Sequence, residues 1–405
     1  MNYDYIIIGS GIIGSSTGFH LKRLNPNLNI LIIEKNQRSG FGNTSKSAAL
    51  YRNLFSSKTS RQLAISSIYF YNKIAENIKL QKSGYLWLFS EEQWNKNKNI
   101  INKFEKDKLE IEIFNKEEIQ KYLNINFFST DKLPDIKKGI FCKNCGSLSA
   151  VALAEYYTNS FVESGGKIIF NKEIKSIKLS GEKELYPPWA EIKIRYLIDN
   201  NSDKYYSNNY VFATGAWTQN ILSSIGIASN IYPKKRQLFG LRIKNSLNMF
   251  NRKDEQYPAI ILPAGGVYIK PILKENTIIV GCADDLGQPY ILSDFNANPQ
   301  YFNKAIKPVL SHYFPSMKGY KLYLKWAGYY AYHWPDKSPV IENVSNITWV
   351  SGTSGSGIMK ADAIGRITAS KLIGDKYATL ADQSRFKVSN LSLYQRKVDL
   401  EKLII

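Results

Sequence analysis

The chain has 405 residues and a net charge of +20, from 54 Lys and Arg against 34 Asp and Glu. This length is sufficient for two domains with a large buried core. An apolar content of 44% is ordinary for a globular protein, and no apolar run approaches the roughly 20 residues that span a bilayer. The apolar residues 5–8 are too few for a signal peptide and follow no basic segment, so we expect a cytoplasmic location.

The positive charge has two interpretations. A nucleic acid or an anionic membrane would be bound through a basic patch. The lysines are instead scattered, with clusters at 96–99 (KNKN) and 234–236 (KKR). We therefore expect a compositional bias, no nucleic-acid partner and at most peripheral contact with acidic lipids.

Cys142 and Cys145 form a CxxC motif. Such a motif is either a redox pair or half of a zinc site. Zinc requires four ligands, and the sequence has neither a second CxxC nor a histidine pair to supply them. We expect no metal site, and we expect the two thiols to lie in a surface turn.

The chain opens with the pattern of a βαβ unit. A short apolar run at 3–9 ends in glycine and predicts a strand, 12–24 predicts a helix, and 29–35 (NILIIEK) predicts a second strand. Further elements are predicted in this order: helix 58–80, surface helices within 92–125, helix 147–166, two strands within 167–179, strand 205–213, several strands within 231–290, helix 297–320, a strand–turn–strand unit at 325–341, strand 347–352 and helix 359–374.

This order is α/β, then β-rich, then α/β again. It predicts an α/β fold in which a Rossmann-like nucleotide-binding domain is interrupted by a β-rich α+β domain. The predicted segments are 1–80, 140–225 and 326–390 for the nucleotide-binding domain, 81–139 and 226–325 for the second domain, and 391–405 for a C-terminal tail.

The turn after the first strand carries the motif GxGxxG, formed by Gly9, Ser10, Gly11, Ile12, Ile13 and Gly14. The motif stands between a strand and a helix, where the first glycine permits a tight turn, the second lets a pyrophosphate approach and the third lets the helix pack on the strand. Free N–H groups at the helix N-terminus attract the anion. Glu34 ends the second strand and can accept hydrogen bonds from a ribose diol.

Two later glycine turns bear on whether the dinucleotide is NAD or FAD. Ala213, Thr214, Gly215, Ala216 and Trp217 follow one strand, and residues 351–357 (SGTSGSG) follow another. The flavin of FAD lies far from its adenine, so it must be enclosed by segments remote from the first motif. Gly and Ser permit the close backbone approach that this requires. The sequence therefore favours FAD.

These motifs together resemble the D-amino acid oxidase-type FAD-dependent oxidoreductases, a family that includes sarcosine oxidase, glycine oxidase and dimethylglycine dehydrogenase. The matching segments are IIIGSGIIG, Glu34, GNTSKSAALYR, VFATGAW, WAGYYAY with PDKSPVI, and SGTSGSGIMKADAIGR, which extend over most of the chain. The resemblance implies an FAD-binding Rossmann-like domain of the glutathione reductase type, interrupted by a substrate domain.

The resemblance also implies cofactor contacts. It places Thr44 and Ser45 at the FAD phosphates or flavin and the backbone near Ile174 at the adenine. It places Gly355, Ser356, Gly357 and Ile358 beneath the pyrimidine side of the flavin, where backbone dipoles would stabilise the reduced ring. The full set of expected FAD contacts is Gly9, Ser10, Gly11, Ile12, Ile13, Gly14, Glu34, Lys35, Thr44, Ser45, Ala49, Ile174, Ala213, Thr214, Gly215, Trp217, Gly355, Ser356, Gly357, Ile358 and Lys360.

On the substrate side, the sarcosine-oxidase-like branch holds the substrate carboxylate with an arginine and a lysine at motif positions matched by Arg52 and Lys360. Both residues have the alternative of being solvated charges. Tyr268 is expected to roof the pocket. Tyr329, Tyr330, Tyr332 and His333 are expected along the flavin edge, where core packing is the alternative for some of them. The expected catalytic set is Arg52, Lys360, Tyr268 and His333.

Two departures from the sarcosine oxidase pattern have consequences. No cysteine stands near 325–336, where those enzymes attach their flavin, so the FAD is predicted to be non-covalent. The lysine that promotes reaction with O2 is matched by Ile278, Ile279 and Val280. A fixed positive charge would stabilise superoxide, so its absence predicts a dehydrogenase with another electron acceptor, such as a quinone or a carrier protein.

Three functions remain open at this stage. The first is a dehydrogenase of a small amino acid or secondary amine such as sarcosine, proline or dimethylglycine. The second is a 2-hydroxy-acid or glycerol-phosphate dehydrogenase, for which residues 234–236 (KKR) would supply further positive charge. The third is a non-catalytic flavoprotein that assists the assembly of respiratory complexes, since the WAGYYAY segment also resembles that branch.

Overall fold

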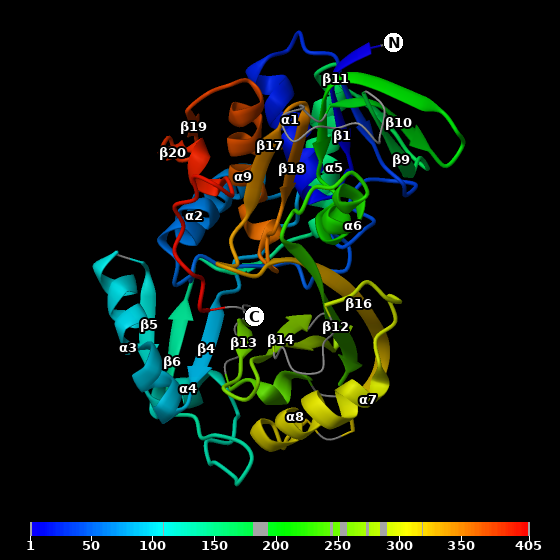
Figure 1. Cartoon of the computed structure of the whole chain (residues 1–405). Helices are drawn as coiled ribbons and strands as arrows, with labels where there is room; N and C mark the ends of the chain where they lie inside the picture. Colours follow the sequence, from blue (N-terminus) through cyan, green and yellow to red (C-terminus); the bar gives the residue numbers. More distant parts are fainter. Residues whose placement is uncertain are drawn as a thin grey trace.

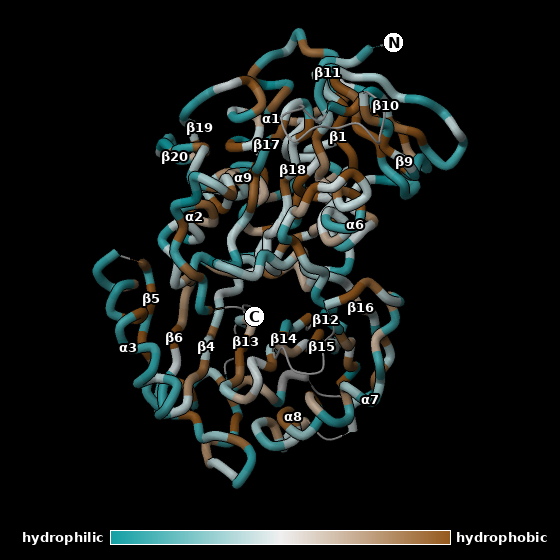
Figure 2. The backbone as a smooth tube through the Cα atoms, in the orientation of Figure 1, coloured by the Kyte–Doolittle hydropathy of each residue, from teal (hydrophilic) through white to brown (hydrophobic). Residues whose placement is uncertain are grey.

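The computed structural model describes residues 2–107, 109–180, 193–243, 246–251, 257–272, 275–283, 290–317 and 319–403. Two large β-sheets dominate it, one in each half of the molecule (Figure 1). Figure 2 shows hydrophobic segments along the interior strands and hydrophilic loops at the rim. Within the described residues, no helix has the length and apolar character that a bilayer crossing requires.

The first sheet has a parallel centre. Its strand order is β17-β18-β11-β1-β2-β8, with the hairpin β9–β10 joined to β11. The pairs β1–β11, β1–β2, β2–β8 and β11–β18 are parallel, and β17–β18 is antiparallel. The bounds are β1 (Asn2–Ile8), β2 (Ile30–Ile33), β8 (Lys167–Ile169), β9 (Ile174–Leu179), β10 (Ile194–Asp199), β11 (Lys204–Phe212), β17 (Val340–Val344) and β18 (Ile347–Ser351).

Both faces of the first sheet are covered, which explains its almost uninterrupted apolar strands. Tyr5 and Ile7 of β1 pack with helices on one face, and Ile6 and Ile8 pack beneath β10 and α6 on the other. The helices of this half are α1 (Ile12–Leu24), α2 (Lys58–Lys73), α5 (Ala150–Glu163), α6 (Thr218–Ser223) and α9 (Gly357–Leu372). The predicted βαβ opening and the predicted closing helix are confirmed.

The second sheet is mainly antiparallel. Its strand order is β16-β12-β15-β14-β13-β4-β6-β5, in which only β13–β4, of the pairs between described strands, is parallel. The bounds are β4 (Tyr85–Phe89), β5 (Ile111–Phe114), β6 (Lys138–Cys142), β12 (Ile231–Arg242), β13 (Ala259–Ile261), β14 (Val267–Ile272), β15 (Thr277–Cys282) and β16 (Lys321–His333).

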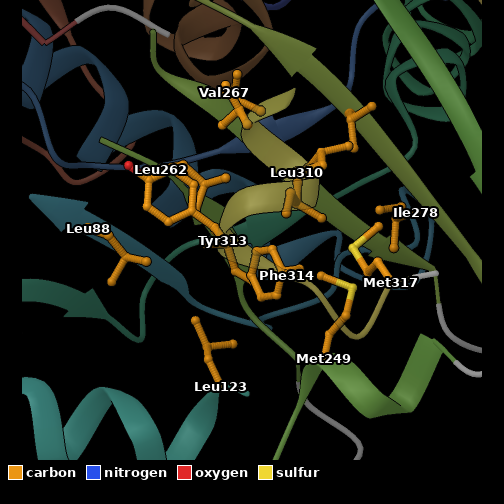
Figure 3. Close-up of a cluster of buried hydrophobic side chains, with 14 of the residues drawn as sticks. Leu88, Leu123, Met249, Leu262, Val267, Ile278, Leu310, Tyr313, Phe314 and Met317 are labelled. Atoms are coloured by element: carbon orange, nitrogen blue, oxygen red, sulfur yellow. The ribbon is translucent and has the colours of Figure 1, made fainter. Parts of the chain in front are cut away.

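The side chains of the second sheet alternate between two environments. Val267, Ile269 and Ile278 pack against α8 in the cluster of Figure 3, whereas Tyr268 lies on the opposite face, toward the first sheet. The helices of this half are α3 (Glu91–Lys106), α4 (Lys116–Tyr122), α7 (Pro299–Tyr301) and α8 (Lys307–Tyr313), the last two joined by a π-turn at Phe302–Ile306.

Smaller ladders and turns complete the two halves. They are β3 (Leu50–Tyr51) with β7 (Gly146–Ser147), β19 (Tyr377–Thr379) with β20 (Arg385–Lys387), and 3-10 turns at Gly215–Trp217, Ser246–Met249 and Val388–Leu391. The α/β fold with a β-rich insertion is confirmed. The exact division of the chain into domain segments stays a prediction, and two of its limits, 139/140 and 325/326, fall inside β6 and β16 of the second sheet.

Candidate functional site

The turn between β1 and α1 has the geometry that the glycine motif predicts. Gly9 has φ +99°, and an added Cβ there would lie 2.8 Å from the carbonyl oxygen of Ala213. A Cβ on Gly14 would lie 1.9 Å from the Gly9 oxygen. At Gly11 the nearest atom would be Thr44 Oγ1, at 3.5 Å. The first and third glycines are therefore required by packing, while the second faces space that a ligand can occupy.

The side chain of Glu34 is fixed beside this turn. Its carboxylate accepts hydrogen bonds from Ser10 N at 2.7 Å and Ser10 Oγ at 3.0 Å, and from Asn36 N at 2.9 Å. Thr44 Oγ1 in turn accepts the free N–H of Ile12 at 3.0 Å, which satisfies one donor of the first turn of α1. Glu34 and Thr44 thus flank the helix N-terminus at which a pyrophosphate would be held.

A second strand-to-helix turn, residues 352–356, lies between β18 and α9. Gly355 has φ +86°, and a Cβ there would lie 2.3 Å from the ring of Tyr330. Ser354 N donates to Ala331 O at 2.9 Å, and Ser354 Oγ accepts from His333 N at 3.0 Å. Helix α9 begins at Gly357 without a side-chain cap, so its free N–H groups are available to a ligand.

One elongated cavity joins these turns. Most of the predicted FAD-contacting residues line it: Gly9, Gly11, Ile12, Ile13, Glu34, Lys35, Thr44, Ile174, Ala213, Thr214, Gly215, Trp217, Gly355, Ser356, Gly357 and Ile358. Five predicted residues lie outside the lining: Ser10, Gly14, Ser45, Ala49 and Lys360. Ser10 donates a hydrogen bond to Glu34, which lines the cavity, and Gly14 lets α1 pack closely against the turn at Gly9.

The cavity fits the elongated shape of FAD. Glu34, Lys35 and Ile174 follow or belong to strands of the first sheet, the two glycine turns also line the cavity, and Tyr85 and Tyr268 belong to strands of the second sheet. Close backbone approach is available at Gly11 and at the start of α9. The cavity thus provides a place for a ribose, a pyrophosphate and a flat ring in turn.

Arg52 lies at the end of the cavity beyond the second glycine turn. Its side chain is 4% exposed, with the guanidinium carbon 4.1 Å from the Phe55 ring centroid. Nη1 donates to Leu54 O and Nη2 donates to Leu403 O. Burial lowers the pKa of Arg52, and Glu401 opposes this shift. A buried guanidinium in a cavity is suited to bind a carboxylate.

Lys360 points away from the cavity, although the sequence paired it with Arg52. Its side chain is fully buried, Nζ lies 3.0 Å from Ser60 Oγ, and it lies 4.2 Å from the Phe55 ring centroid. Burial lowers the pKa of Lys360 to about 7. Ile358 and Met359 line the cavity, and one step of about 100° along the helix turns the next residue toward α2. Phe55, which lines the cavity, contacts the lysine, and Lys360 itself does not line the cavity.

Tyrosines and a second arginine surround the same end. Tyr268, Tyr330 and Tyr85 line the cavity, and burial raises the pKa of Tyr268 well above its usual range. Arg236, from the KKR cluster, also lines the cavity, with its guanidinium 5.2 Å from the Tyr330 ring centroid. Side chains alternate along β12, so this alternation could have predicted that Arg236 and Leu238 lie on the same face of the strand, the face that lines the cavity.

His333 does not line the cavity. Its side chain is 2% exposed and its Nδ1 lies 3.0 Å from Asp336 Oδ1. Burial would raise the pKa of Asp336, but Arg396 and His333 outweigh it and hold that pKa at about 2. His333 therefore belongs to an ion-pair network under the 334–338 turn, and it is no candidate for contact with a substrate in this structure.

A lysine near residues 278–280 bears on the predicted electron acceptor, and the expectation that the two CxxC thiols lie in a surface turn is wrong. The residues at 278–280 are apolar, but Lys270 of β14 pairs with Ile279 and shares the cavity side of the sheet with Tyr268. Its Nζ donates to Ala48 O at 2.8 Å, and burial lowers its pKa to about 8. Cys142 and Cys145 are fully buried free thiols beside Asn53 Oδ1, rather than residues of a surface turn.

The site defines a flavoprotein oxidoreductase class, and comparison with known proteins agrees. The model of the family "FAD dependent oxidoreductase" (DAO) matches residues 4–371. The chain belongs to this family and binds FAD.

Individual relatives are distant. The "FAD-dependent oxidoreductase domain-containing protein 1" of Xenopus laevis is 22% identical over 93% of this chain and 80% of its own length. An L-proline dehydrogenase from P. horikoshii has a TM-score of 0.76 at 21% identity, over 92% of this chain and 93% of its own. A glycine oxidase from Geobacillus kaustophilus has a TM-score of 0.76 at 17% identity, over 98% and 99%. These two structures share the fold.

Proposed function

We propose that the protein removes a hydride from the carbon next to the nitrogen of a small amino acid or secondary amine, of the sarcosine, proline or dimethylglycine type. The observation that carries the proposal is Arg52, a buried guanidinium at the end of the cavity beyond the glycine turn that begins α9. When bound, FAD supplies the hydride acceptor.

The protein's own residues supply binding and orientation. The guanidinium of Arg52 binds the substrate carboxylate, which fixes the adjacent carbon over the site. Tyr85, Tyr268 and Tyr330 form aromatic walls that exclude water from an apolar side chain. The free N–H groups at the start of α9 would stabilise negative charge on the reduced cofactor. The Tyr268 hydroxyl stays protonated at neutral pH, because burial raises its pKa.

We propose that FAD is held without a covalent bond. None of the three cysteines, Cys142, Cys145 and Cys282, lines the cavity. We also propose that the electrons pass to a quinone or a carrier protein instead of O2. Lys270 is the lysine that could promote reaction with O2. However, its Nζ donates a hydrogen bond to the Ala48 carbonyl, and Lys270 does not line the cavity.

The second candidate is oxidation of a 2-hydroxy acid or a glycerol phosphate, and the presence of Arg236 in the cavity lining favours it. Two arginines would suit a substrate of higher negative charge. In that case Arg236 would bind the second anionic group.

The test is an anaerobic titration of the purified holoprotein, followed by its visible flavin spectrum. Loss of the oxidised bands on adding proline or sarcosine supports amine oxidation. Loss only with a 2-hydroxy acid or glycerol phosphate supports the second candidate. If none of these compounds reduces the flavin, both proposals fail and a non-catalytic role in the assembly of respiratory complexes becomes the leading hypothesis. Where a compound does reduce the flavin, readmitting air measures how slowly O2 reoxidises the protein.

A further inference from the structure

The C-terminal segment crosses from the first sheet to the second. It leaves the β19–β20 ladder, passes α2 and ends between the two sheets (Figure 1). Arg396 anchors its first part, since it is ion-paired with Asp336 and donates to Pro339 O at 2.9 Å and Ser338 O at 2.9 Å. The network that contains His333 therefore fixes the path of the tail.

Two acidic residues fix the next part of the tail to the N-terminus of α2. Asp399 accepts hydrogen bonds from Lys58 N at 2.8 Å and Ser57 Oγ at 2.9 Å. Glu401 accepts from Ser56 N and Ser57 N, both at 3.0 Å. Free N–H groups and the helix dipole both favour carboxylates at this end of a helix. The tail is therefore bound by specific contacts.

The last described residues reach the cavity. Glu401 is 2% exposed and belongs to the cavity lining. Leu403 is 7% exposed and packs in the cluster that contains Leu54, Tyr85 and Tyr268. Its carbonyl oxygen accepts a hydrogen bond from Arg52 Nη2. The tail thus contacts the residue on which the proposed carboxylate binding depends.

We propose that the segment Asp399–Leu403 is part of the substrate site, in which Glu401 and Leu403 are positioning residues that hold Arg52 for a substrate carboxylate. This inference rests on the proposed function, because it assigns that role to Arg52. A guanidinium has five N–H donors. Arg52 donates hydrogen bonds from Nη1 to the Leu54 carbonyl and from Nη2 to the Leu403 carbonyl. These two carbonyls set the plane of the guanidinium and leave donors for a ligand.

The contacts and charge of Glu401 support the same role. Burial lowers the pKa of both Arg52 and Lys360, and Glu401 opposes both shifts. Within the described part of the chain, Arg52 forms no ion pair with a carboxylate. Glu401 Oε1 accepts a hydrogen bond from Leu403 N at 2.8 Å, and the Leu403 carbonyl accepts from Arg52. Glu401 therefore holds the residue that orients Arg52, without occupying the donors of the guanidinium.

The experiment uses acetate and acetamide, two small probes of equal shape that differ in charge, titrated into the holoprotein while the flavin spectrum is followed. Wild type is compared with Glu401→Ala, with Arg52→Met and with the double variant. Lys402→Ala is the matched control, because its side chain is exposed next to Glu401. Flavin content is measured for each variant, and Leu403→Ala replaces Glu401→Ala if the latter loses its flavin.

We expect Glu401→Ala to weaken acetate binding about tenfold or more, and to leave acetamide unchanged. Lys402→Ala binds acetate as wild type does. In the Arg52→Met background, Glu401→Ala has no further effect, since the two residues act as one unit.

Equal acetate affinity in wild type and Glu401→Ala would overturn the inference. The inference would also be overturned if the effects of Glu401→Ala and Arg52→Met on acetate affinity were additive in the double variant. It would be overturned as well if Arg52→Met left the acetate dissociation constant unchanged. Bleaching by an amine is a separate observation, so failure of the proposed reaction is distinguishable from failure of the positioning role.

Discussion

The two ends of the cavity are built in different ways. The cofactor end is formed by backbone turns within short, contiguous segments, at 9–14 and 352–358, where glycine conformations create the space. The proposed substrate end is formed by side chains from β4, β12, β14 and the loop at Arg52, together with a tail near residue 401. A motif can therefore reveal the cofactor, while the substrate depends on strands that only folding brings together.

The largest expected effects are on FAD binding and stability, and they should differ between two glycines of the same motif, Gly11 and Gly14. Gly14→Ala places a Cβ 1.9 Å from the Gly9 oxygen, so we expect loss of both FAD and stability. Gly11→Ala meets only Thr44 Oγ1 at 3.5 Å, so the apoprotein stays folded while FAD affinity falls at least about tenfold. Flavin absorbance and thermal unfolding of the apoproteins measure both quantities. Equal thermal stability of the two apoproteins, or wild-type flavin content in Gly11→Ala, would contradict the assignment of these turns.

At the substrate end, the comparison is between Arg52 and Lys360. Arg52→Lys should raise KM for a carboxylate substrate by about 10- to 100-fold, because a lysine cannot reproduce the planar fork. Lys360→Met should change KM by less than about threefold, because Lys360 does not line the cavity and its Nζ lies beside Ser60 Oγ. Steady-state kinetics under identical conditions measure both. A larger change in KM at Lys360 would support the hypothesis made from the sequence, in which Arg52 and Lys360 hold the substrate carboxylate together.

Lys360 also predicts a pH dependence of stability. Its folded-state pKa is about 7, below the ordinary value of 10.5, so between these values the unfolded chain binds more protons. The free energy of unfolding should then rise with pH from 7 toward 10.5, by up to about 1.4 kcal/mol per pH unit from this group. Lys360→Met should remove this slope. Urea unfolding at pH 7, 8 and 9 tests it, and an unchanged slope in the variant would refute the assignment.

The smallest effect is expected at Lys270. Since its Nζ donates to Ala48 O and it does not line the cavity, Lys270→Met should change the rate of reoxidation by air by less than about threefold. Stopped-flow mixing of the reduced protein with O2 measures this rate. A decrease of tenfold or more would assign Lys270 to O2 reduction and would contradict the proposed acceptor.

The cofactor end was predictable because its signals are local. The strand, glycine turn and helix at 2–24 appear where periodicity and the motif place them. Glu34 and the turn before α9 were predicted for the same reason. Ser10 and Gly14 belong to the motif, although they support the cavity from behind it.

At the proposed substrate end, the residues expected from the sequence divide into two groups. Arg52 and Tyr268 line the cavity, whereas Lys360 and His333 do not, since a residue's position in a motif does not fix the direction of its side chain. Strand alternation could have revealed Arg236 and Lys270. The role of the tail could not be predicted, because its contacts join residues more than 340 positions apart, as between Glu401 and Ser57.

The central claim is that the cavity places an oxidisable substrate beside FAD, with its carboxylate on Arg52. The most direct test is the anaerobic visible spectrum of the purified holoprotein before and after proline or sarcosine is added, in wild type and Arg52→Met. The account predicts flavin bands in both proteins, and bleaching at low substrate concentration in wild type alone. It is contradicted if neither protein contains or takes up flavin, or if Arg52→Met is bleached as readily as wild type.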